Sequence, residues 1–239
     1  MTATVLNLPL ADGREADRAH ILSMQFAGAD AEAILQHAIH RAFVGEVALV
    51  SSFGAESAVL LHLVAQVAPA TPVVFLDTQK HFAQTLSYRR KMATRLGLTN
   101  VRDILPDADE AKAQDPTNDL WRRDTEACCD LRKVRPLKTA LDGFDAWISG
   151  RKAFHGGDRV SLPAFEWNGR HFKVNPLASW SQSDVQAYTE KHDLPAHPLV
   201  AQGYPSIGCW PCTRPVEAGD DIRSGRWSGE KRECGIHTR

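Results

Sequence analysis

Short apolar runs alternate with stretches of helical spacing along the first 150 residues, and this alternation constrains the fold most. Four runs rich in valine, leucine and isoleucine predict buried strands: residues 46–51, 73–76, 101–105 and 146–148. Three stretches between them repeat apolar side chains with a helical period: residues 58–67, 81–96 and 128–141. Such alternation predicts a parallel α/β sheet with right-handed crossovers, flanked by helices.

The two ends of the chain differ from this pattern. Residues 16–43 have helical spacing and predict one or two helices before the first strand. Beyond residue 150, residues 165–172 predict a hairpin around Asn168-Gly169, and residues 181–192 predict a capped helix. We therefore expect three parts: an N-terminal helical segment at 1–43, an α/β domain with a loop-rich end at 44–227, and a C-terminal tail at 228–239.

Composition argues against several classes of protein. The 239 residues include 28 basic and 29 acidic side chains, so no bulk positive charge favours nucleic acid or an anionic membrane. No apolar run approaches the ~20 residues that cross a bilayer. Residues 1–20 also lack the basic-then-apolar order of a secretory signal. We expect a cytoplasmic protein that binds neither nucleic acid nor membrane.

Five cysteines fall into three groups. Cys128 and Cys129 are adjacent, Cys209 and Cys212 form a Cys-x-x-Cys motif, and Cys234 stands alone near the carboxyl end. An odd number fits poorly with a complete disulfide framework, and a reducing compartment favours metal or redox chemistry. The first four cysteines have the pattern of metal ligands, and the fifth has that of a reactive thiol.

The two cysteine pairs can hold one metal centre between them. Adjacent cysteines strain a single tetrahedral zinc ion, whose ligands are usually separated by roughly two to four residues, but they can bind neighbouring irons of a cluster. We favour a [4Fe-4S] cluster on Cys128, Cys129, Cys209 and Cys212, which would also tie the loop-rich sequence to the helix at 128–141. A structural zinc site and buried cysteines without a ligand role remain alternatives.

Cys234 has the surroundings of an activated thiol. Positive charge that stabilises a thiolate is supplied by Lys231, Arg232, His237 and Arg239. Gly235 supplies a hinge next to the cysteine. We predict that Cys234 is a nucleophile on a mobile tail, and an exposed thiol on a frayed terminus is the alternative.

Two predicted strands end in small polar residues that suit an anion. The first runs into Ser51-Ser52-Phe53-Gly54-Ala55-Glu56-Ser57 and then a helix, so that backbone N–H groups and the helix dipole point at one place. Asp77-Thr78 ends the next strand, where open α/β sheets bind ligands. Plain helix caps are the alternative for both turns, and the first lacks the Gly-Lys-Ser/Thr of a Walker loop.

Three ordered signatures carry a family likeness. They are Cys128-Cys129-x-x-Arg132-Lys133-Val134-x-Pro136-Leu137, Ser206-Ile207-Gly208-Cys209-x-x-Cys212-Thr213-Arg214 and Glu233-Cys234-Gly235-Ile236-His237. Together they resemble the assimilatory adenylyl-sulfate reductases, of the phosphoadenylyl-sulfate/adenylyl-sulfate reductase family. The likeness extends to Ser52-Phe53-Gly54-Ala55-Glu56, to Asp77-Thr78 and to Asn175-Pro176-Leu177. This chain has Gln79 where the family usually has glycine, and it diverges after Arg151-Lys152.

The resemblance implies an adenine nucleotide α-hydrolase-like fold, a [4Fe-4S] cluster, a homo-oligomer, and reduction of adenylyl sulfate to sulfite and AMP. In that chemistry the Cys234 thiolate attacks sulfur, AMP leaves, and thioredoxin, glutaredoxin or a similar dithiol expels sulfite from the S-sulfonated cysteine. Cations must surround the two anions as they meet. The substrate-binding residues that we expect are Ser51, Ser52, Phe53, Gly54, Asp77, Thr78, Lys133, Arg151, Arg159, Arg223, Arg226 and His237.

Three other functions remain open from the sequence. A sibling enzyme acts on the 3′-phosphorylated nucleotide, alone or as one of two substrates, but it generally lacks the four paired cysteines. A nucleotide-loop enzyme that thiolates RNA usually has a basic surface, which the net charge of -1 does not indicate. A zinc-stapled interaction protein would leave Cys234 without a role.

Overall fold

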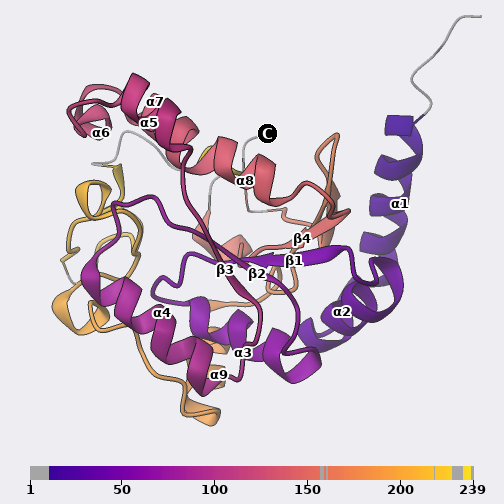
Figure 1. Cartoon of the computed structure of the whole chain (residues 1–239). Coiled ribbons are helices and arrows are strands. Elements are labelled where there is room, and N and C mark those ends of the chain that lie inside the picture. The colour runs from indigo at the N-terminus through magenta and orange to yellow at the C-terminus, as the bar shows by residue number, and fades with distance from the viewer. Residues whose placement is uncertain (1–10, 157–158, 160, 218, 228–233, 238–239) are drawn as a thin grey trace, which may run out of the picture.

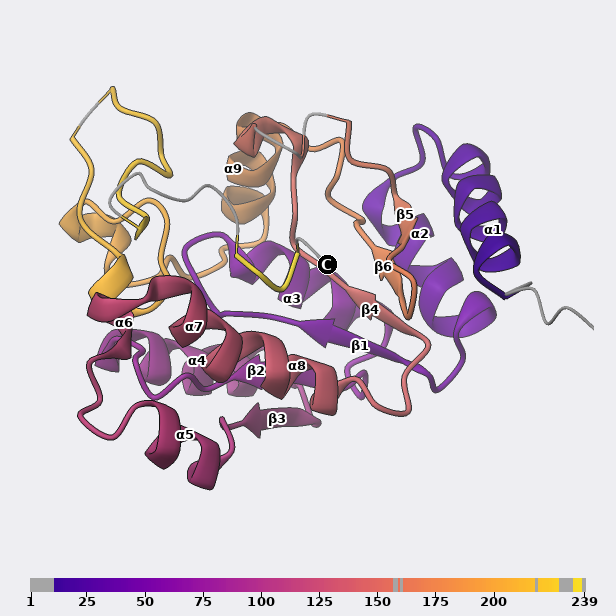
Figure 2. The same cartoon turned by 90° about the horizontal axis from the view of Figure 1, so that it is seen from above.

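Strands in the described chain form one six-stranded sheet in the order β3-β2-β1-β4-β6-β5 (Figures 1 and 2). The computed structural model describes residues 11–156, 159, 161–217, 219–227 and 234–237. The strands are β1 (Val47–Val50), β2 (Val73–Leu76), β3 (Val101–Ile104), β4 (Ala146–Ile148), β5 (Phe165–Trp167) and β6 (Phe172–Val174). Neighbours are parallel except β5, which pairs antiparallel with β6. The predicted parallel sheet and hairpin are confirmed.

Two helices precede the sheet in the part of the chain that the structure describes, as expected for residues 16–43. They are α1 (Ala11–Gln25) and α2 (Ala31–His37), and α2 continues as one π-helical turn, Ala38–Ala42. The Asp30 side chain caps α2 by accepting a hydrogen bond of 2.7 Å from the backbone N–H of Ala33. Helix α1 starts earlier than predicted and lies against the edge strand β5 (Figure 2).

Helices also connect the strands and cover both faces of the sheet. These helices are α3 (Ser57–Val67), α4 (Ala83–Arg95), α5 (Ala108–Gln114), α6 (Leu120–Arg123), α7 (Thr125–Cys129), α8 (Arg135–Ala140) and α9 (Gln182–Lys191). In Figure 1, α8 lies above the sheet, and α3, α4 and α9 lie below it. The helices predicted from periodicity are confirmed, and α5 and α6 are additional. Single 3₁₀ turns are formed by Ala153–His155, Val200–Gln202 and Trp210–Cys212.

The stretch predicted as one helix at 128–141 has an irregular centre. Helix α7 continues into a π-helical segment, Asp130–Val134, and then into α8. Pro136 lies in the first turn of α8, where it cannot donate a backbone hydrogen bond and would crowd the carbonyl four residues earlier. The wider π-helical turn before it relieves this conflict. The same continuous helix therefore carries both Cys128 and Lys133.

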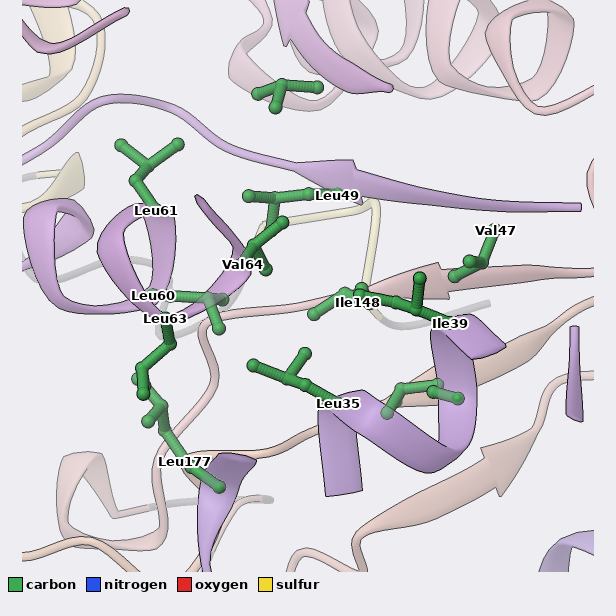
Figure 3. Packing of buried hydrophobic residues seen from close by; sticks show 14 of the residues in the cluster. Leu35, Ile39, Val47, Leu49, Leu60, Leu61, Leu63, Val64, Ile148 and Leu177 are labelled. Carbon is green, nitrogen blue, oxygen red and sulfur yellow. The ribbon is translucent and has the colours of Figure 1, made fainter. Parts of the chain in front are cut away.

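The main hydrophobic core lies between one face of the sheet and helices α2 and α3 (Figure 3). In Figure 3, Leu35 of α2 points toward Ile148 of β4. A smaller core on the other face joins Ala48, Val74, Trp147, Leu76, Leu137 and Leu141. Burial of one leucine contributes about 1.5–3 kcal/mol. Strands β1 and β4 are thus buried on both faces and give rigid support to the residues at their ends.

The sheet reverses its winding direction between β1 and β4. These strands are neighbours, but the chain runs from β1 to β2 on one side and from β4 to the β5–β6 hairpin on the other. A crevice therefore opens at their carboxyl ends, where Ser51 and Ser149 follow the two strands. Among the helices described, none is both long and apolar enough to cross a membrane.

Candidate active site

A cavity of about 240 Å³ opens at the carboxyl ends of β1 and β4, where open α/β sheets bind ligands. Its lining combines the turn after β1, the helix at Lys133, the segment after β4 and the C-terminal region. The lining residues with acidic or Lys/Arg side chains in the described chain are Glu56, Lys133, Arg151, Lys152, Arg159, Arg223 and Arg226. One carboxylate thus accompanies six cationic side chains, so the cavity suits a ligand with several negative charges.

The turn after β1 packs closely against the segment that contains Ile207. The Ser51 hydroxyl accepts a hydrogen bond of 3.2 Å from the backbone N–H of Phe53, which has a left-handed φ of 48°. A Cβ on Gly54 would lie 3.0 Å from the carbonyl oxygen of Ile207, so glycine lets two segments pass in contact. Helix α3 begins at Ser57, and the side chain of its N-cap residue, Glu56, makes no capping hydrogen bond. The Ser57 N–H donates to the carbonyl oxygen of Gly54, and the N–H groups that follow it in the first turn of α3 can bind an anion.

Glu56 instead fixes two basic residues from the segment after β4. Its Oε2 lies 2.8 Å from Lys152 Nζ and 3.1 Å from His155 Nε2. Burial raises the pKa of Glu56, but hydrogen bonds and charge from His155 and Lys152 outweigh burial and hold that pKa at about 2. Lys152 is only 3% exposed, and burial lowers its pKa against the charge of Glu56. The carboxylate thus holds Lys152 as a buried cation at the cavity wall.

Two arginines lie on the same side of the cavity. Arg151 forms an ion pair of 2.8 Å with Glu166 on β5, and it is itself buried. Arg159 NH1 lies 3.0 Å from His155 Nδ1. We call residues 51, 52 and 54–57 together with Arg151, Lys152, His155 and Arg159 the loop side of the cavity.

Another part of the lining places cations next to cysteines. Lys133, Arg226 and Cys234 line it together, and we call these three residues the thiol side. Burial disfavours the charge on Lys133, but the neighbouring thiols of Cys209, Cys234 and then Cys129 outweigh burial and raise its pKa above the ordinary value. The Lys133 ammonium is therefore stabilised by sulfur groups, Cys234 among them.

Arg226 is the second cation of the thiol side. Burial lowers its pKa, and Cys209 and then Cys234 oppose that effect. Its guanidinium lies 4.3 Å from the centre of the Trp227 ring, and a Cβ on Gly208 would collide with it. The aromatic ring and the glycine together fix the guanidinium beside Cys234. Arg223, also in the lining, lies 5.9 Å from the same ring centre.

Residues 234–237 reach the cavity from the carboxyl end of the chain. Cys234 and His237 both line it, and the His237 ring stacks on Trp147 with centroids 5.6 Å apart and an interplanar angle of 18°. The other cations expected around Cys234 lie outside the described residues; they are Lys231, Arg232 and Arg239.

A second, smaller cavity adjoins the first and gathers the other four cysteines. Cys128, Cys129, Cys209 and Cys212 all line it and are free thiols. Burial, with a further contribution from Cys209, raises the pKa of Cys128 to about 11. The two cavities share Thr78, Lys133 and Cys209 in their linings. Within the described ranges, no group of three or more His, Cys, Asp or Glu side chains is arranged to hold a single metal ion.

Polar contacts fix the helix of Cys128 and Cys129 against the end of β2. Arg132, which is 3% exposed, forms an ion pair of 2.8 Å with Asp115 and donates a hydrogen bond of 3.2 Å to the carbonyl oxygen of Thr78. The Thr78 hydroxyl in turn lies 3.3 Å from Cys209 Sγ. Thr78 therefore contacts both the cysteine cavity and the larger cavity.

Ten of the twelve substrate-binding residues expected from the sequence line the larger cavity. They are Ser51, Ser52, Gly54, Thr78, Lys133, Arg151, Arg159, Arg223, Arg226 and His237. Phe53 and Asp77 are not part of the lining. The Phe53 ring is buried against Phe75, and the Asp77 carboxylate accepts a hydrogen bond of 2.9 Å from the backbone N–H of Gln79. Gln79 has a left-handed φ of 59°, which explains why glycine suits that position.

Sequence reasoning assigned no role to Glu56, Lys152, His155 or Trp147, which also line the cavity. A usable signal was present for two of them. Glu56 ends the motif Ser52-Phe53-Gly54-Ala55-Glu56, and Lys152 belongs to the basic pair after β4. Because β1 and β4 are neighbours, opposite charges just beyond their ends meet.

Comparison with known proteins finds relatives that carry the names of phosphosulfate reductases. A family model described as the phosphoadenosine phosphosulfate reductase domain matches residues 46–215. A Mesorhizobium japonicum protein named adenosine 5′-phosphosulfate reductase is 50% identical over 205 residues, which cover 85% of this chain and 81% of that protein. A protein of the same name from a Chelativorans species is 48% identical over 218 residues, covering 90% and 89%.

Solved structures are similar to this chain as well. A phosphoadenylyl-sulfate reductase from Candida auris matches with a TM-score of 0.71 and 25% identity, covering 83% of this chain and 97% of that one. Yeast FAD synthetase matches with a TM-score of 0.54 and 15% identity, covering 85% and 76%, which shows the fold alone. The expected adenine nucleotide α-hydrolase-like fold is confirmed. With the family model matching most of its length, the chain belongs to the phosphoadenosine phosphosulfate reductase family.

Proposed function

We propose that the chain reduces adenylyl sulfate to sulfite and AMP in sulfate assimilation, through an S-sulfonated Cys234 that a protein dithiol resolves. One observation carries this proposal: Cys234 lines the same cavity as an anion-binding turn and six cationic side chains. Adenylyl sulfate joins a phosphate to a sulfate through an anhydride oxygen, so its two anionic groups need cations on both sides. The Mesorhizobium and Chelativorans relatives named adenosine 5′-phosphosulfate reductase support the same substrate.

The loop side binds the phosphate in this proposal. N–H groups of the first turn of α3 and the hydroxyls of Ser51 and Ser52 donate to its oxygens, and Lys152 neutralises it from a position fixed by Glu56. Apolar lining residues near the end of β2, such as Leu76 and Ile207, offer a surface for the adenine ring. The sulfate then extends toward the thiol side, where Lys133 and Arg226 bind its oxygens.

The first step is displacement at sulfur. The Cys234 thiolate attacks the sulfate sulfur, a sulfur–sulfur bond forms, and the sulfur–oxygen bond of the anhydride breaks with its electron pair going to AMP. Lys133 and Arg226 make this approach of two anions feasible because their charge offsets the repulsion. AMP needs no proton to leave, since its phosphate oxygen is already a weak base.

The second step releases sulfite. A thiolate of the dithiol attacks Cys234 Sγ, the bond to the sulfonate breaks with its electron pair going to sulfite, and a mixed disulfide remains. The second thiol of the dithiol then attacks the partner's sulfur atom in the mixed disulfide. The partner is left with an internal disulfide, and the Cys234 thiolate is released. The dithiol thus supplies both electrons. Thioredoxin or glutaredoxin is the donor that we propose.

The four paired cysteines hold a [4Fe-4S] cluster in this proposal. Four free thiols on one buried cavity are the donor set of such a cluster, and Arg132 and Lys133 in the same lining offset its negative charge. When bound, the cluster supplies fixed charge beside Lys133 and joins α7 to the loop that carries Cys209.

The proposal includes a cytoplasmic location and a homo-oligomer, as the resemblance implies. The 3′-phosphorylated nucleotide, phosphoadenylyl sulfate, is the second candidate substrate. The matching family model and the Candida auris structure are both named as reductases of that nucleotide. The four paired cysteines favour the unphosphorylated nucleotide.

The test is a turnover assay with anaerobically purified protein, thioredoxin and each nucleotide in turn. We expect stoichiometric sulfite and AMP from adenylyl sulfate, with kcat/KM at least about a hundredfold above that for the 3′-phosphorylated form, the range in which one extra small group on a substrate changes kcat/KM. The protein should also be brown and contain iron and sulfide. Equal or better turnover of the 3′-phosphorylated nucleotide would reverse the substrate assignment. A colourless preparation that contains zinc would contradict the proposed iron–sulfur cluster.

A further inference from the structure

The segment that carries Cys234 is seated on the sheet by side chains outside the expected substrate-binding set. Residues 234–237 form one turn, in which the N–H of His237 donates a hydrogen bond of 2.9 Å to the carbonyl oxygen of Cys234. A contact that fixes His237 therefore also fixes the backbone of Cys234. We call these four residues the cysteine turn.

Two strand residues hold the far end of the cysteine turn. Trp147 on β4 and Lys173 on β6 are direct partners in the parallel ladder, so their side chains lie next to each other on one face of the sheet. The Lys173 ammonium lies 5.6 Å from the centre of the Trp147 ring and donates a hydrogen bond of 3.2 Å to the His237 carbonyl oxygen. The His237 ring stacks on Trp147. Trp147 and Lys173 are 1% and 3% exposed, so both belong to the rigid sheet.

The middle of the cysteine turn meets the helix of Lys133. Ile236 packs against the small core that includes Trp147 and Leu137. A Cβ on Gly235 would lie 3.2 Å from a methyl group of Val134, the residue after Lys133. The turn is therefore held from two sides, and Cys234 faces the cavity beside Lys133.

We propose that Lys173, supported by Trp147, is a positioning residue that seats the Cys234 thiol beside Lys133 and Arg226 for its attack on substrate. The inference rests on the proposed role of Cys234. Lys173 is not part of the cavity lining, so it acts through the cysteine turn and not on the substrate. A nucleophile held at the reacting distance gains rate because its freedom has already been lost, and small displacements cost large factors.

The two chemical steps should respond differently to loss of this contact. The first step needs Cys234 seated at the cavity. The second step needs the S-sulfonated Cys234 to meet an external thiol, for which the seat gives no advantage. Removal of the Lys173 donor should slow sulfonation of Cys234 and leave release of sulfite unchanged or faster.

The test is a pair of single-turnover measurements on Lys173→Met, which keeps an unbranched apolar side chain but removes the donor. Rapid mixing with ³⁵S-labelled adenylyl sulfate gives the rate of Cys234 sulfonation, and dithiothreitol added to the isolated labelled enzyme gives the rate of sulfite release. We expect sulfonation to slow about tenfold, which corresponds to about 1.4 kcal/mol. Sulfite release should stay within about twofold, and Lys173→Arg should recover most of the sulfonation rate.

Two further variants keep the test decisive. Ile236→Ser weakens the seat from the tail side without altering the sheet, so it should reproduce the split if Lys173→Met fails to fold. Lys138→Met removes an exposed lysine of α8 and should change neither rate. Equal slowing of both steps in Lys173→Met and Ile236→Ser, or no slowing in either, would refute the proposal that Lys173 positions Cys234. Failure of the wild-type protein to label Cys234 would instead refute the proposed function.

Discussion

The loop side and the thiol side of the cavity use positive charge in different ways. On the loop side Lys152 pairs with Glu56 and Arg151 pairs with Glu166, so these cations are balanced before any ligand arrives. On the thiol side, the groups that favour the charge of Lys133 and Arg226 are thiols, and Arg226 also contacts the Trp227 ring and the Ser206 hydroxyl. A paired cation is held in one place and offers modest net charge, whereas a cation facing a thiol supplies its charge where the thiol reacts. In the proposed mechanism the loop side therefore binds the phosphate, and the thiol side supports the attack on sulfur.

The largest effect should come from removing one cation from each side in turn. Lys133→Met should lower kcat by about 10²–10³, the loss seen when one donor to a developing charge is removed. Lys152→Met should act mainly on KM, raising it about tenfold, because it removes a phosphate contact present before and during the reaction. Steady-state kinetics of both variants, with iron content measured to confirm intact clusters, checks this split. A loss of kcat as large in Lys152→Met as in Lys133→Met would contradict the division of roles between the two sides.

The second-largest effect should be a loss of folding stability in acid, when the Glu56 carboxylate of the loop side is protonated. The pKa of Glu56 falls from 4.5 to about 2 in the folded protein, so the folded state keeps this carboxylate ionised where the unfolded chain protonates it. The resulting stability is complete above about pH 5 and is lost as the pH falls toward about 2. The shift corresponds to about 3 kcal/mol.

Urea unfolding at pH 7, 5 and 3 measures this contribution in wild type and in Glu56→Gln. The variant should be less stable at pH 7, because Lys152 and His155 lose their carboxylate, and it should lose less stability than wild type on acidification. Parallel pH profiles for the two proteins would show that Glu56 is not held ionised by its partners.

The smallest effect concerns the close approach at Gly54. A Cβ there would press on the Ile207 carbonyl oxygen, so Gly54→Ala should cost about 1–2 kcal/mol of unfolding free energy and raise KM. Gly13→Ala in α1 is the matched control, since its Cβ would meet open space and alanine favours a helix by about 0.5–1 kcal/mol. Thermal melts of both variants compare them. A harmless Gly54→Ala would mean that the turn tolerates more space than the contact indicates.

Much of the fold was predictable because burial imposes a period on the sequence. Strands such as β1 and β2 are buried throughout or nearly so, and α3 places seven buried residues on the main core. Helix α5 was missed because none of its seven residues is buried, so no apolar period marks it. The π-helical turns were missed because a helical period of apolar residues does not distinguish an α-helix from a single π-helical turn.

The candidate site also has features that the sequence predicted and features that it did not. Its cysteines and basic residues stood out in the sequence because their chemistry is unusual and they lie in compact motifs. The pairing of Glu56 with Lys152 joins residues 96 positions apart, and the seating of His237 by Lys173 joins residues 64 positions apart. Such contacts follow from the order of strands in the sheet, which no local pattern encodes.

The central claim is that Cys234 itself takes the sulfonate from the nucleotide. The most direct measurement is mass spectrometry of the anaerobic protein after incubation with ³⁵S-labelled adenylyl sulfate in the absence of any dithiol. We expect one sulfonate per chain on the peptide that contains Cys234, released as sulfite on addition of thioredoxin, and no label in Cys234→Ser. Label on another cysteine, or label that persists in Cys234→Ser, would contradict the account.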